Sequence, residues 1–522
     1  MPPPHKKLAD SLSALQGLQK AGHRVINSRE LTRTHRERLV ANGFLQPVTK
    51  GWWISSSPGA RAGDSTPWYA SFWEFCARYC GDRFGHDWHL SPEQSLLLLA
   101  ENSVIPRQIV VYTPKGTNHN LELPFGTSLY DLKTTELPTA AELMERDGMH
   151  LFTVPAALVK VPESFFARQP IETQVLLASL RDASDVLRLL LSGGNSAKAG
   201  AIAGALRHIG RAELADEIVK TMKGAGYDAR ENDPYDATQA VAALAPATSP
   251  IVGRMQAMWE SMRGAVVETF PQQPGLPADR DRYLQFVDDI YKSDAYHSLS
   301  IEGYSVSPAL IERVQRGNWN PATDEEDRHN RDALAARGYW QAFQRVKATI
   351  GDIIAGANAG ARARATHMEW YRELFQPFVT AGVIPAAALA GYRNDAVYLR
   401  TSRYVPPRWE AVRDAMPALF DLLESEPHPG ARAVLGHWLF GYIHPFPDGN
   451  GRVARFVMNA MLASGGYPWT VIRVEDRDAY LSGLDSASID MDIRAFAAFI
   501  AERVRWSLER SDEGGEHGSK SG

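Results

Sequence analysis

Hydrophobic residues near the start of the chain recur at the spacing of an amphipathic helix. Leucines at positions 8, 12, 15 and 18 lie three or four residues apart, and Ala21-Gly22 ends the segment. Ser28 is placed to cap a short second helix, and a third helix is expected from Thr34 to Asn42. Residues 44–54 are then expected to form a small hairpin. Three helices and a hairpin are the order of a winged helix, and a small helical cap domain is the alternative.

Beyond this head, connecting segments alternate with longer folded stretches. Residues 56–66 are rich in Ser, Pro and Gly, which is typical of a linker. The next stretch mixes helical periodicity with strand-like runs at 108–112 and 151–154. We therefore predict a mainly α, multi-domain protein with a winged-helix-like head at 1–55, an α+β domain at 67–165, a helical region at 166–228, a linker region at 229–279, an all-α domain at 280–510 and a disordered tail at 511–522.

Composition places the chain among ordinary soluble proteins, because its 522 residues are 44% hydrophobic and 22% charged. No apolar run approaches the roughly 20 residues of a membrane-spanning helix. The only cysteines, Cys76 and Cys80, favour a reducing compartment, and we expect a cytoplasmic protein without membrane contact. Together with His86 and His89, their spacing suggests a zinc site. Cysteines four apart on an apolar helix nevertheless favour buried packing.

Charge is unevenly distributed along the chain. The net charge of −5 argues against a protein coated in positive charge. Residues 1–50, however, hold nine Lys and Arg against three Asp and Glu, which is typical of a specialised basic end. On a winged helix such residues would meet DNA phosphates; a solvated basic face or a protein-docking surface is the alternative. The basic positions concerned are Arg24, Arg29, Arg33, Arg36, Arg38 and Lys50.

The stretch from His444 to Arg455 carries the strongest chemical signal. Its sequence is His-Pro-Phe-Pro-Asp-Gly-Asn-Gly-Arg-Val-Ala-Arg. Pro445 ends the preceding helix, expected over 431–442, because a residue before proline avoids helical dihedrals. Gly449 and Gly451 permit unusual backbone angles and close approach of a ligand. A second helix follows, so free backbone N–H groups at its N-terminus form a natural anion site.

Charged side chains of the same stretch complete a site for phosphate chemistry. Arg452 and Arg455 lie three residues apart on the first helical turn and can clamp phosphate oxygens. Asp448 offers a carboxylate suited to Mg²⁺ that bridges phosphates. His444 can accept a proton from a hydroxyl near neutral pH. The combination indicates phosphoryl or nucleotidyl transfer, against the simpler reading of a glycine-rich turn with solvated arginines.

This stretch resembles the Fic family, whose signature is H-P-F-x-[D/E]-G-N-G-R-x-x-R, and all nine fixed positions match. The resemblance implies an all-α Fic fold with a β-hairpin flap, and transfer of AMP from ATP to a Ser, Thr or Tyr hydroxyl of a target protein. It implies that His444 is the base and that Asp448 is the Mg²⁺ ligand. It also implies nucleotide-binding roles for Gly449, Asn450, Gly451, Arg452 and Arg455. Weaker expectations of the same kind concern Asn459, Arg477 and Tyr480 near the nucleotide.

A second motif lies before the catalytic stretch. Ser298-Leu-Ser-Ile-Glu302-Gly303 matches the inhibitory pattern [S/T]-x-x-x-E-[G/N] of the same family, after a helix expected over 284–296. The resemblance implies that Glu302 pairs with Arg455, so that Arg455 is no longer available to bind the γ-phosphate of ATP. A helix that ends in a solvated Glu-Gly is the alternative. Tyr304, which follows, departs from the pattern.

Two further resemblances are less specific. Residues 400–407 resemble the hairpin flap on which Fic proteins dock their target, which implies docking roles for Arg400, Thr401, Ser402 and Arg403; an ordinary hairpin is the alternative. Residues 8–165 resemble AbiEi-type regulators, and this resemblance rests on residues 22–32, 51–54 and 90–95. Members of that group have a winged-helix head.

The sequence therefore predicts a protein adenylyltransferase that uses ATP and Mg²⁺ and is autoinhibited by Glu302. Removal of AMP from a target is one alternative. The other is a DNA-binding, antitoxin-like regulator whose Fic domain is silent or senses nucleotides.

Overall fold

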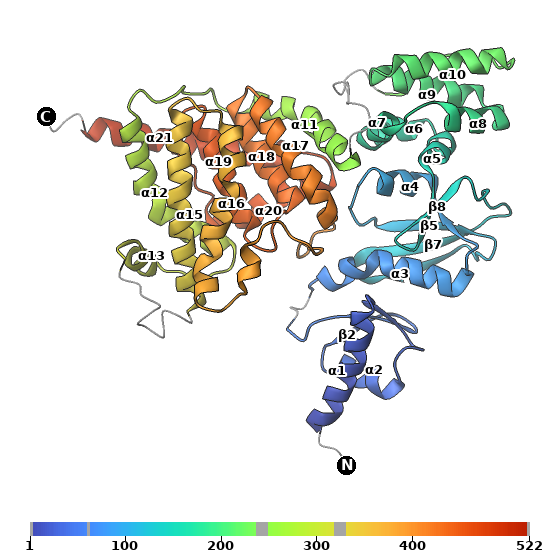
Figure 1. Cartoon of the computed structure of the whole chain (residues 1–522), viewed down its shortest axis with the longest axis horizontal. Coiled ribbons are helices and arrows are strands. Elements are labelled where there is room, and N and C mark those ends of the chain that lie inside the picture. The colour runs from blue at the N-terminus through green and yellow to red at the C-terminus, as the bar shows by residue number, and fades with distance from the viewer. Residues whose placement is uncertain (1–3, 60–62, 236–248, 318–329, 519–522) are drawn as a thin grey trace. The chain divides into compact units, whose positions relative to one another are not determined.

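The computed structural model describes residues 4–59, 63–235, 249–317 and 330–518. The chain divides into two compact units. The N-terminal unit comprises residues 1–250 together with Tyr398–Val405, and the C-terminal unit comprises Ile251–Val397 and Pro406–Gly522. Figure 1 shows the elements of each unit, coloured along the chain.

The N-terminal head has two helices and three strands. They are α1 (Pro4–Lys20), β1 (Val25–Asn27), α2 (Arg33–Ala41), β2 (Leu45–Thr49) and β3 (Trp52–Ser55), with β3 between the other two strands. The predicted hairpin is thus confirmed as β2–β3. The helix expected after Ser28 is wrong, because this segment is a turn: the Asn27 side chain accepts from the Arg29 N–H at 3.0 Å, and the Arg36 guanidinium donates to the carbonyls of Ser28 and Leu31.

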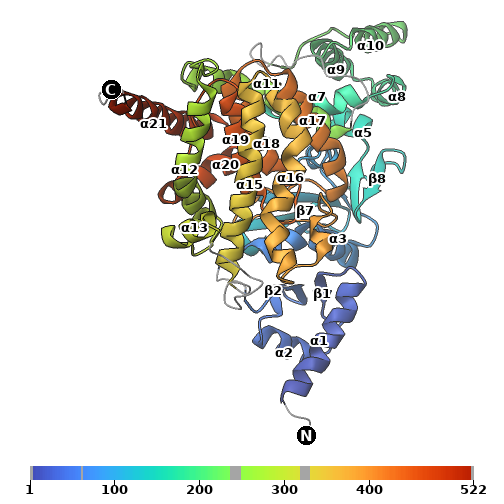
Figure 2. The ribbon, with the colours of Figure 1, turned by 60° about the vertical axis from the view of Figure 1, so that its left-hand side comes forward.

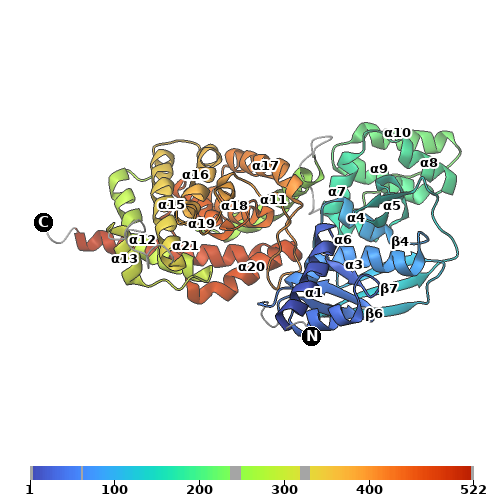
Figure 3. The same cartoon turned by 60° about the horizontal axis from the view of Figure 1, so that its bottom comes forward.

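The α+β part packs the long helix α3 (Thr66–Phe84) with a four-stranded sheet (Figure 3). The sheet order is β4-β5-β7-β6, with β5 and β7 parallel and the other pairs antiparallel. The remaining elements are β4 (His89–Leu90), α4 (Pro92–Leu99), β5 (Gln108–Thr113), β6 (His119–Leu123), η1 (Pro124–Gly126), β7 (Thr127–Lys133), β8 (Leu143–Arg146), β9 (Met149–Phe152) and α5 (Val154–Lys160).

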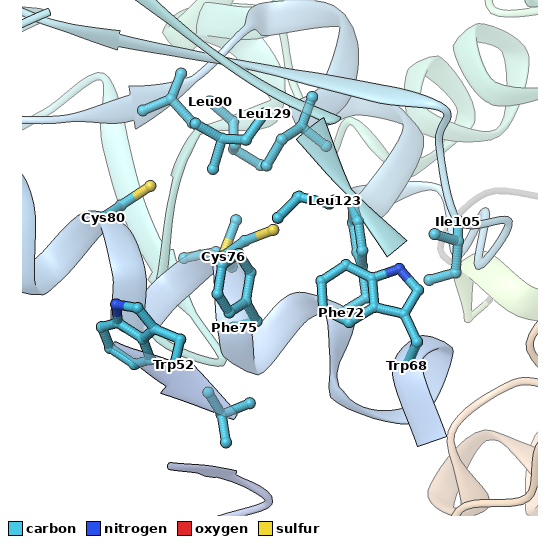
Figure 4. Packing of buried hydrophobic residues seen from close by; sticks show 14 of the residues in the cluster. Trp52, Trp68, Phe72, Phe75, Cys76, Cys80, Leu90, Ile105, Leu123 and Leu129 are labelled. Carbon is cyan, nitrogen blue, oxygen red and sulfur yellow. The ribbon is translucent and has the colours of Figure 1, made fainter. Parts of the chain in front are cut away.

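Cys76 and Cys80 lie in the core of this part, as Figure 4 shows. Both are fully buried on α3, among aromatic and aliphatic side chains that include Phe75 and Leu90. The expectation that these cysteines pack in an apolar core is confirmed by their burial.

A helical region follows, as predicted. It consists of α6 (Ser164–Arg168), α7 (Pro170–Ser179), α8 (Ser184–Gly193), α9 (Ser196–His208) and α10 (Ala212–Gly224). The prediction of a linker over 229–279 is wrong in part, because helix α11 (Pro250–Thr269) lies within it and buries apolar side chains such as Trp259. Residues 236–248 of that prediction lie outside the described residues.

The C-terminal unit is helical, as predicted. Figure 2 shows the long neighbouring helices α15 (Arg331–Ile354) and α16 (Ala359–Thr380), with α12 (Arg280–Ile301) beside α15. The remaining elements are α13 (Pro308–Gln315), η2 (Ala386–Leu389), η3 (Trp409–Ala411), α17 (Val412–Ser425), α18 (Pro429–Ile443), α19 (Asn450–Ala463), η4 (Val474–Asp476), α20 (Arg477–Ile489) and α21 (Arg494–Gly518). Helix α21 covers most of the tail predicted to be disordered, and residues 519–522 lie outside the described residues.

Helices α18 and α19 form the centre of this unit. Nearly every residue of both is buried, and α15 and α16 pack against α19. The loop 444–449 joins the two helices, so a rigid core fixes both of its ends. Within the described ranges, no helix is both long enough and apolar enough to cross a membrane.

Candidate active site

The loop between α18 and α19 is closed by its own side chains. His444 ends α18 in a left-handed conformation with φ of +50°, and Gly449 begins α19 with φ of +79°. The Asn450 side chain accepts from the Phe446 N–H at 2.9 Å and donates to the Phe446 carbonyl at 2.8 Å. This reciprocal pair fixes the backbone of the loop. Asn450 thereby supports the predicted anion site at Gly449–Gly451, which we call the cradle.

His444 is partly exposed, and its ring is oriented by its own helix. Its Nδ1 lies 3.3 Å from the Gly441 carbonyl oxygen, which can only accept, so Nδ1 carries the proton and Nε2 has the free lone pair. Burial lowers the pKa of His444 to about 4, against the smaller opposing influence of the Gly441 carbonyl. The ring is therefore neutral at pH 7 and able to accept a proton at Nε2.

Arg393 stabilises the same loop through hydrogen bonds. No sequence motif indicated this residue. This buried guanidinium donates to the carbonyls of His444 at 2.8 Å and Asp395 at 2.9 Å, and also to that of Pro407. Its backbone N–H donates to the Pro445 carbonyl at 2.8 Å. Arg393 thereby satisfies carbonyls that the end of α18 leaves without helical partners.

Arg452 is fully buried, with an aromatic ring on each of two sides. Its guanidinium carbon lies 5.4 Å from the centre of the Tyr304 ring and 5.0 Å from that of Phe375. Asp448, whose side chain is 60% exposed, approaches one nitrogen only at 3.5 Å. Nε and Nη1 have no hydrogen-bond partner among the described residues. A buried cation with vacant donors next to a helix N-terminus is suited to bind an anion.

Arg455 is engaged by the end of α12. Its Nη2 donates to Glu302 Oε1 at 2.7 Å, and its Nε donates to Ser298 Oγ at 2.9 Å. Although burial acts in the opposite direction, Arg455 and Arg452 hold the pKa of Glu302 below its ordinary value. Nη1 of Arg455 has no partner in the described part of the chain. The structure therefore brings the two predicted motifs into direct contact through a charged pair.

Gly451 and Gly303 make this contact possible. A Cβ on Gly451 would lie 2.3 Å from Glu302 Oε1, so the carboxylate uses the space that a side chain would fill. Gly303 has φ of +87° and ends α12, after which the Tyr304 N–H donates back to the Leu299 carbonyl at 3.1 Å. This turn brings Tyr304 against Arg452.

The residues with weaker expectations have structural partners. Asn459 bonds both backbone groups of Thr470, at 2.8 Å and 3.2 Å. Tyr480 is buried, with its hydroxyl 2.8 Å from His437 Nε2. Arg477 Nε donates to the Ile301 carbonyl at 3.1 Å, which fixes the last turn of α12.

The predicted flap residues belong to a different compact unit from the residues of the loop 444–449. Arg400, Thr401, Ser402 and Arg403 group with the N-terminal unit, where the Ile105 N–H donates to the Arg403 carbonyl at 2.8 Å. The predicted hairpin is wrong, because residues 400–407 contain no strand. Thr401 has a left-handed φ of +62°, and Pro406 and Pro407 have no N–H to donate to a ladder.

Comparisons with known proteins find relatives of the C-terminal unit. Residues 364–462 match the model of the Fic/DOC family, so the C-terminal part of the chain carries a Fic domain. A protein adenylyltransferase Fic of Nematostella vectensis is 44% identical over 122 residues, which are 23% of this chain and 28% of the relative. One of Drosophila willistoni is 30% identical over 230 residues, 42% of this chain and 41% of the relative.

The chain spans less than half the length of these curated relatives. Among solved structures, a fragment of Fic-1 from C. elegans is 18% identical with a TM-score of 0.37, covering 68% of this chain and 99% of the fragment.

Proposed function

We propose that the C-terminal unit is a protein adenylyltransferase that transfers AMP from ATP to a Ser, Thr or Tyr hydroxyl of a target protein. The carrying observation is the set of vacant, buried guanidinium donors of Arg452 and Arg455 beside the Gly449–Gly451 cradle. These groups suit the β- and γ-phosphates of a nucleotide, because fixed cations stabilise phosphate charge most strongly where water is excluded. The curated relatives are named protein adenylyltransferases, which supports the same reaction.

The proposed reaction is a direct displacement at the α-phosphorus. The target hydroxyl oxygen attacks this atom, and its proton passes to Nε2 of His444. The bond from the α-phosphorus to the bridging oxygen breaks, and diphosphate leaves. A neutral His444 with its tautomer set by Gly441 is ready for the proton transfer. Arg393 keeps the ring and the loop in place.

The residues present fit a magnesium ion that arrives with ATP. Mg²⁺ is commonly held by one or two carboxylates together with substrate phosphates, and Asp448 offers an exposed carboxylate at the edge of the cradle. When bound, the ion would neutralise part of the phosphate charge. One oxygen of Asp448 already accepts from the Gly449 N–H at 2.6 Å, which orients the carboxylate.

We further propose that Glu302 is an intramolecular brake. Its carboxylate lies against the cradle and occupies Arg455, the arginine assigned to the γ-phosphate. A nucleotide must therefore displace the Glu302 carboxylate, or it binds without a contact to Arg455. Release of one charge-assisted hydrogen bond corresponds to roughly a tenfold or larger change in an equilibrium constant.

Labelling with ATP that carries ³²P on the α-phosphate tests both proposals. The full chain with Glu302→Ala should label itself or lysate proteins about tenfold more than the unmodified chain. Glu312→Ala, which removes a half-exposed carboxylate paired with Lys292 and Arg316, is the matched control and should change nothing. Adding His444→Ala to Glu302→Ala should abolish labelling. Label transferred from γ-³²P ATP instead would identify phosphorylation and contradict the proposed reaction.

The role of the head stays a prediction. Several of its arginines have protein partners: Arg38 donates to the Lys7 carbonyl and Ser11, Arg29 pairs with Asp82, and Arg36 contacts backbone carbonyls. No observation here favours DNA binding. The winged-helix assignment, the resemblance of residues 8–165 to AbiEi-type regulators and a cytoplasmic location likewise stay predictions.

A further inference from the structure

The helix that carries Glu302 contains a second acidic residue, buried outside the candidate active site. Asp294, Ser298 and Glu302 are spaced by four residues, so they lie along one face of α12. Asp294 is 3% exposed, and its Oδ2 accepts a hydrogen bond of 2.5 Å from the Tyr339 hydroxyl on α15. Tyr339 is fully buried.

The proposed reaction gives this carboxylate no task. Burial raises the pKa of Asp294 to about 6, while Tyr339 and Arg455 act in the opposite direction. Asp294 is therefore largely ionised at pH 7, and its bond to Tyr339 is charge-assisted. A buried ionised group is costly, and packed apolar residues of the same volume are often as stable. The placement of Asp294 calls for a reason other than stability.

Continuity of the helix connects Asp294 to the brake. One turn after Asp294, the Ser298 side chain and carbonyl accept from Arg455 at 2.9 Å and 3.1 Å. One turn later, Glu302 accepts from the same guanidinium. Eight residues of a helix span about 12 Å as a stiff rod. A directional bond at one end therefore limits rotation and sliding at the other.

We propose that the Asp294–Tyr339 hydrogen bond sets the rotation and axial position of α12 against α15, and so holds Glu302 on Arg455. Asp294 and Tyr339 are positioning residues of the brake and act through Glu302. The inference rests on the proposed adenylyltransferase function and deepens its regulation. Removing the bond should weaken inhibition although Glu302 and both arginines remain.

Tyr339→Phe in the full chain tests this inference. The substitution removes only the hydroxyl and keeps the ring, which packs against Phe456 with centroids 5.1 Å apart. Labelling from α-³²P ATP should rise about fivefold or more. Tyr291→Phe is the matched control, because the buried Tyr291 hydroxyl, which lies on α12 like Asp294, has no hydrogen-bond partner among the described residues. This control should leave labelling unchanged.

Comparing Tyr339→Phe with and without Glu302→Ala distinguishes a positioning role of Tyr339 from a general effect on stability. With Glu302→Ala present, Tyr339→Phe should give no further rise, because the brake it positions is gone; general damage would lower labelling in both backgrounds. Asp294→Leu with Tyr339→Phe removes both polar groups of this hydrogen bond and should also raise labelling. If Glu302→Ala activates while neither Tyr339→Phe nor this double variant does, the positioning role is wrong. If Glu302→Ala itself stays inactive, the proposed brake fails and this inference fails with it.

Discussion

Glu302 and Gly451 lie so close that no side chain fits between them. A Cβ on Gly451 would stand 2.3 Å from Glu302 Oε1 and 3.2 Å from Arg455 Nη1. The glycine of the predicted anion cradle and the carboxylate of the predicted inhibitory motif therefore share one space. An anion that approaches this part of the cradle meets the negative charge of Glu302 first.

Gly451→Ala should destabilise the chain because the added methyl group collides with Glu302. Overpacking of this kind costs roughly 1–3 kcal/mol, and thermal unfolding would measure it as a lowered Tm. Adding Glu302→Ala should recover part of the loss, since only the Arg455 contact then remains. Gly264→Ala on α11, where no atom lies within 4 Å of the new Cβ, should be neutral or slightly stabilising. Equal destabilisation in both Glu302 backgrounds would contradict the proposed collision.

The pH dependence of labelling should be that of a base with a low pKa. His444 has a pKa of about 4, below the 6.5 of an exposed histidine, because burial disfavours its charged form. The ring stays neutral from pH 8 to pH 5, so its protonation should not slow labelling over this range. The rate should fall only as the pH approaches 4. A single-turnover pH profile of the Glu302→Ala chain would measure this, and a midpoint between 6 and 7 would exclude a base with the low pKa of His444.

The parts of the site that could be predicted from sequence are those that are local. The residues from His444 to Arg455 lie in one loop and the first two turns of one helix, so their spacing alone places the base beside the cradle. The approach of Glu302 to Arg455 spans 153 residues of sequence and was expected only through the family resemblance. Arg393 and Tyr339 had no signal at all, because each acts on an element far along the chain. Residues 400–407 do not form the predicted hairpin, because left-handed Thr401 and the two prolines, which lack an N–H, disfavour a strand ladder.

Removal of Arg393 should lower both stability and rate. Arg393→Met keeps much of the side-chain length but leaves the His444, Asp395 and Pro407 carbonyls without their donor. Leaving a buried carbonyl without its donor costs about 1–3 kcal/mol for each group, and thermal unfolding would report the loss as a lowered Tm. At a temperature where the variant is folded, kcat should fall more than KM rises, because His444 is displaced while the arginines remain. Arg372→Met is the control, since the side chain of exposed Arg372 makes a single long hydrogen bond of 3.4 Å within the described residues.

The ring of Tyr304, rather than its hydroxyl, should matter for nucleotide binding. Tyr304 and Phe375 flank Arg452 and hold its guanidinium with Nε and Nη1 vacant. In the Glu302→Ala background, Tyr304→Phe should leave the KM for ATP unchanged because a phenyl ring keeps the cation–π contact. Tyr304→Leu should raise the KM for ATP about two- to thirtyfold, the factor for roughly 0.5–2 kcal/mol of cation–π interaction. Titration of ATP in the labelling assay would measure both values. Equal KM values for the Leu and Phe variants would show that Arg452 needs no aromatic partner at this position.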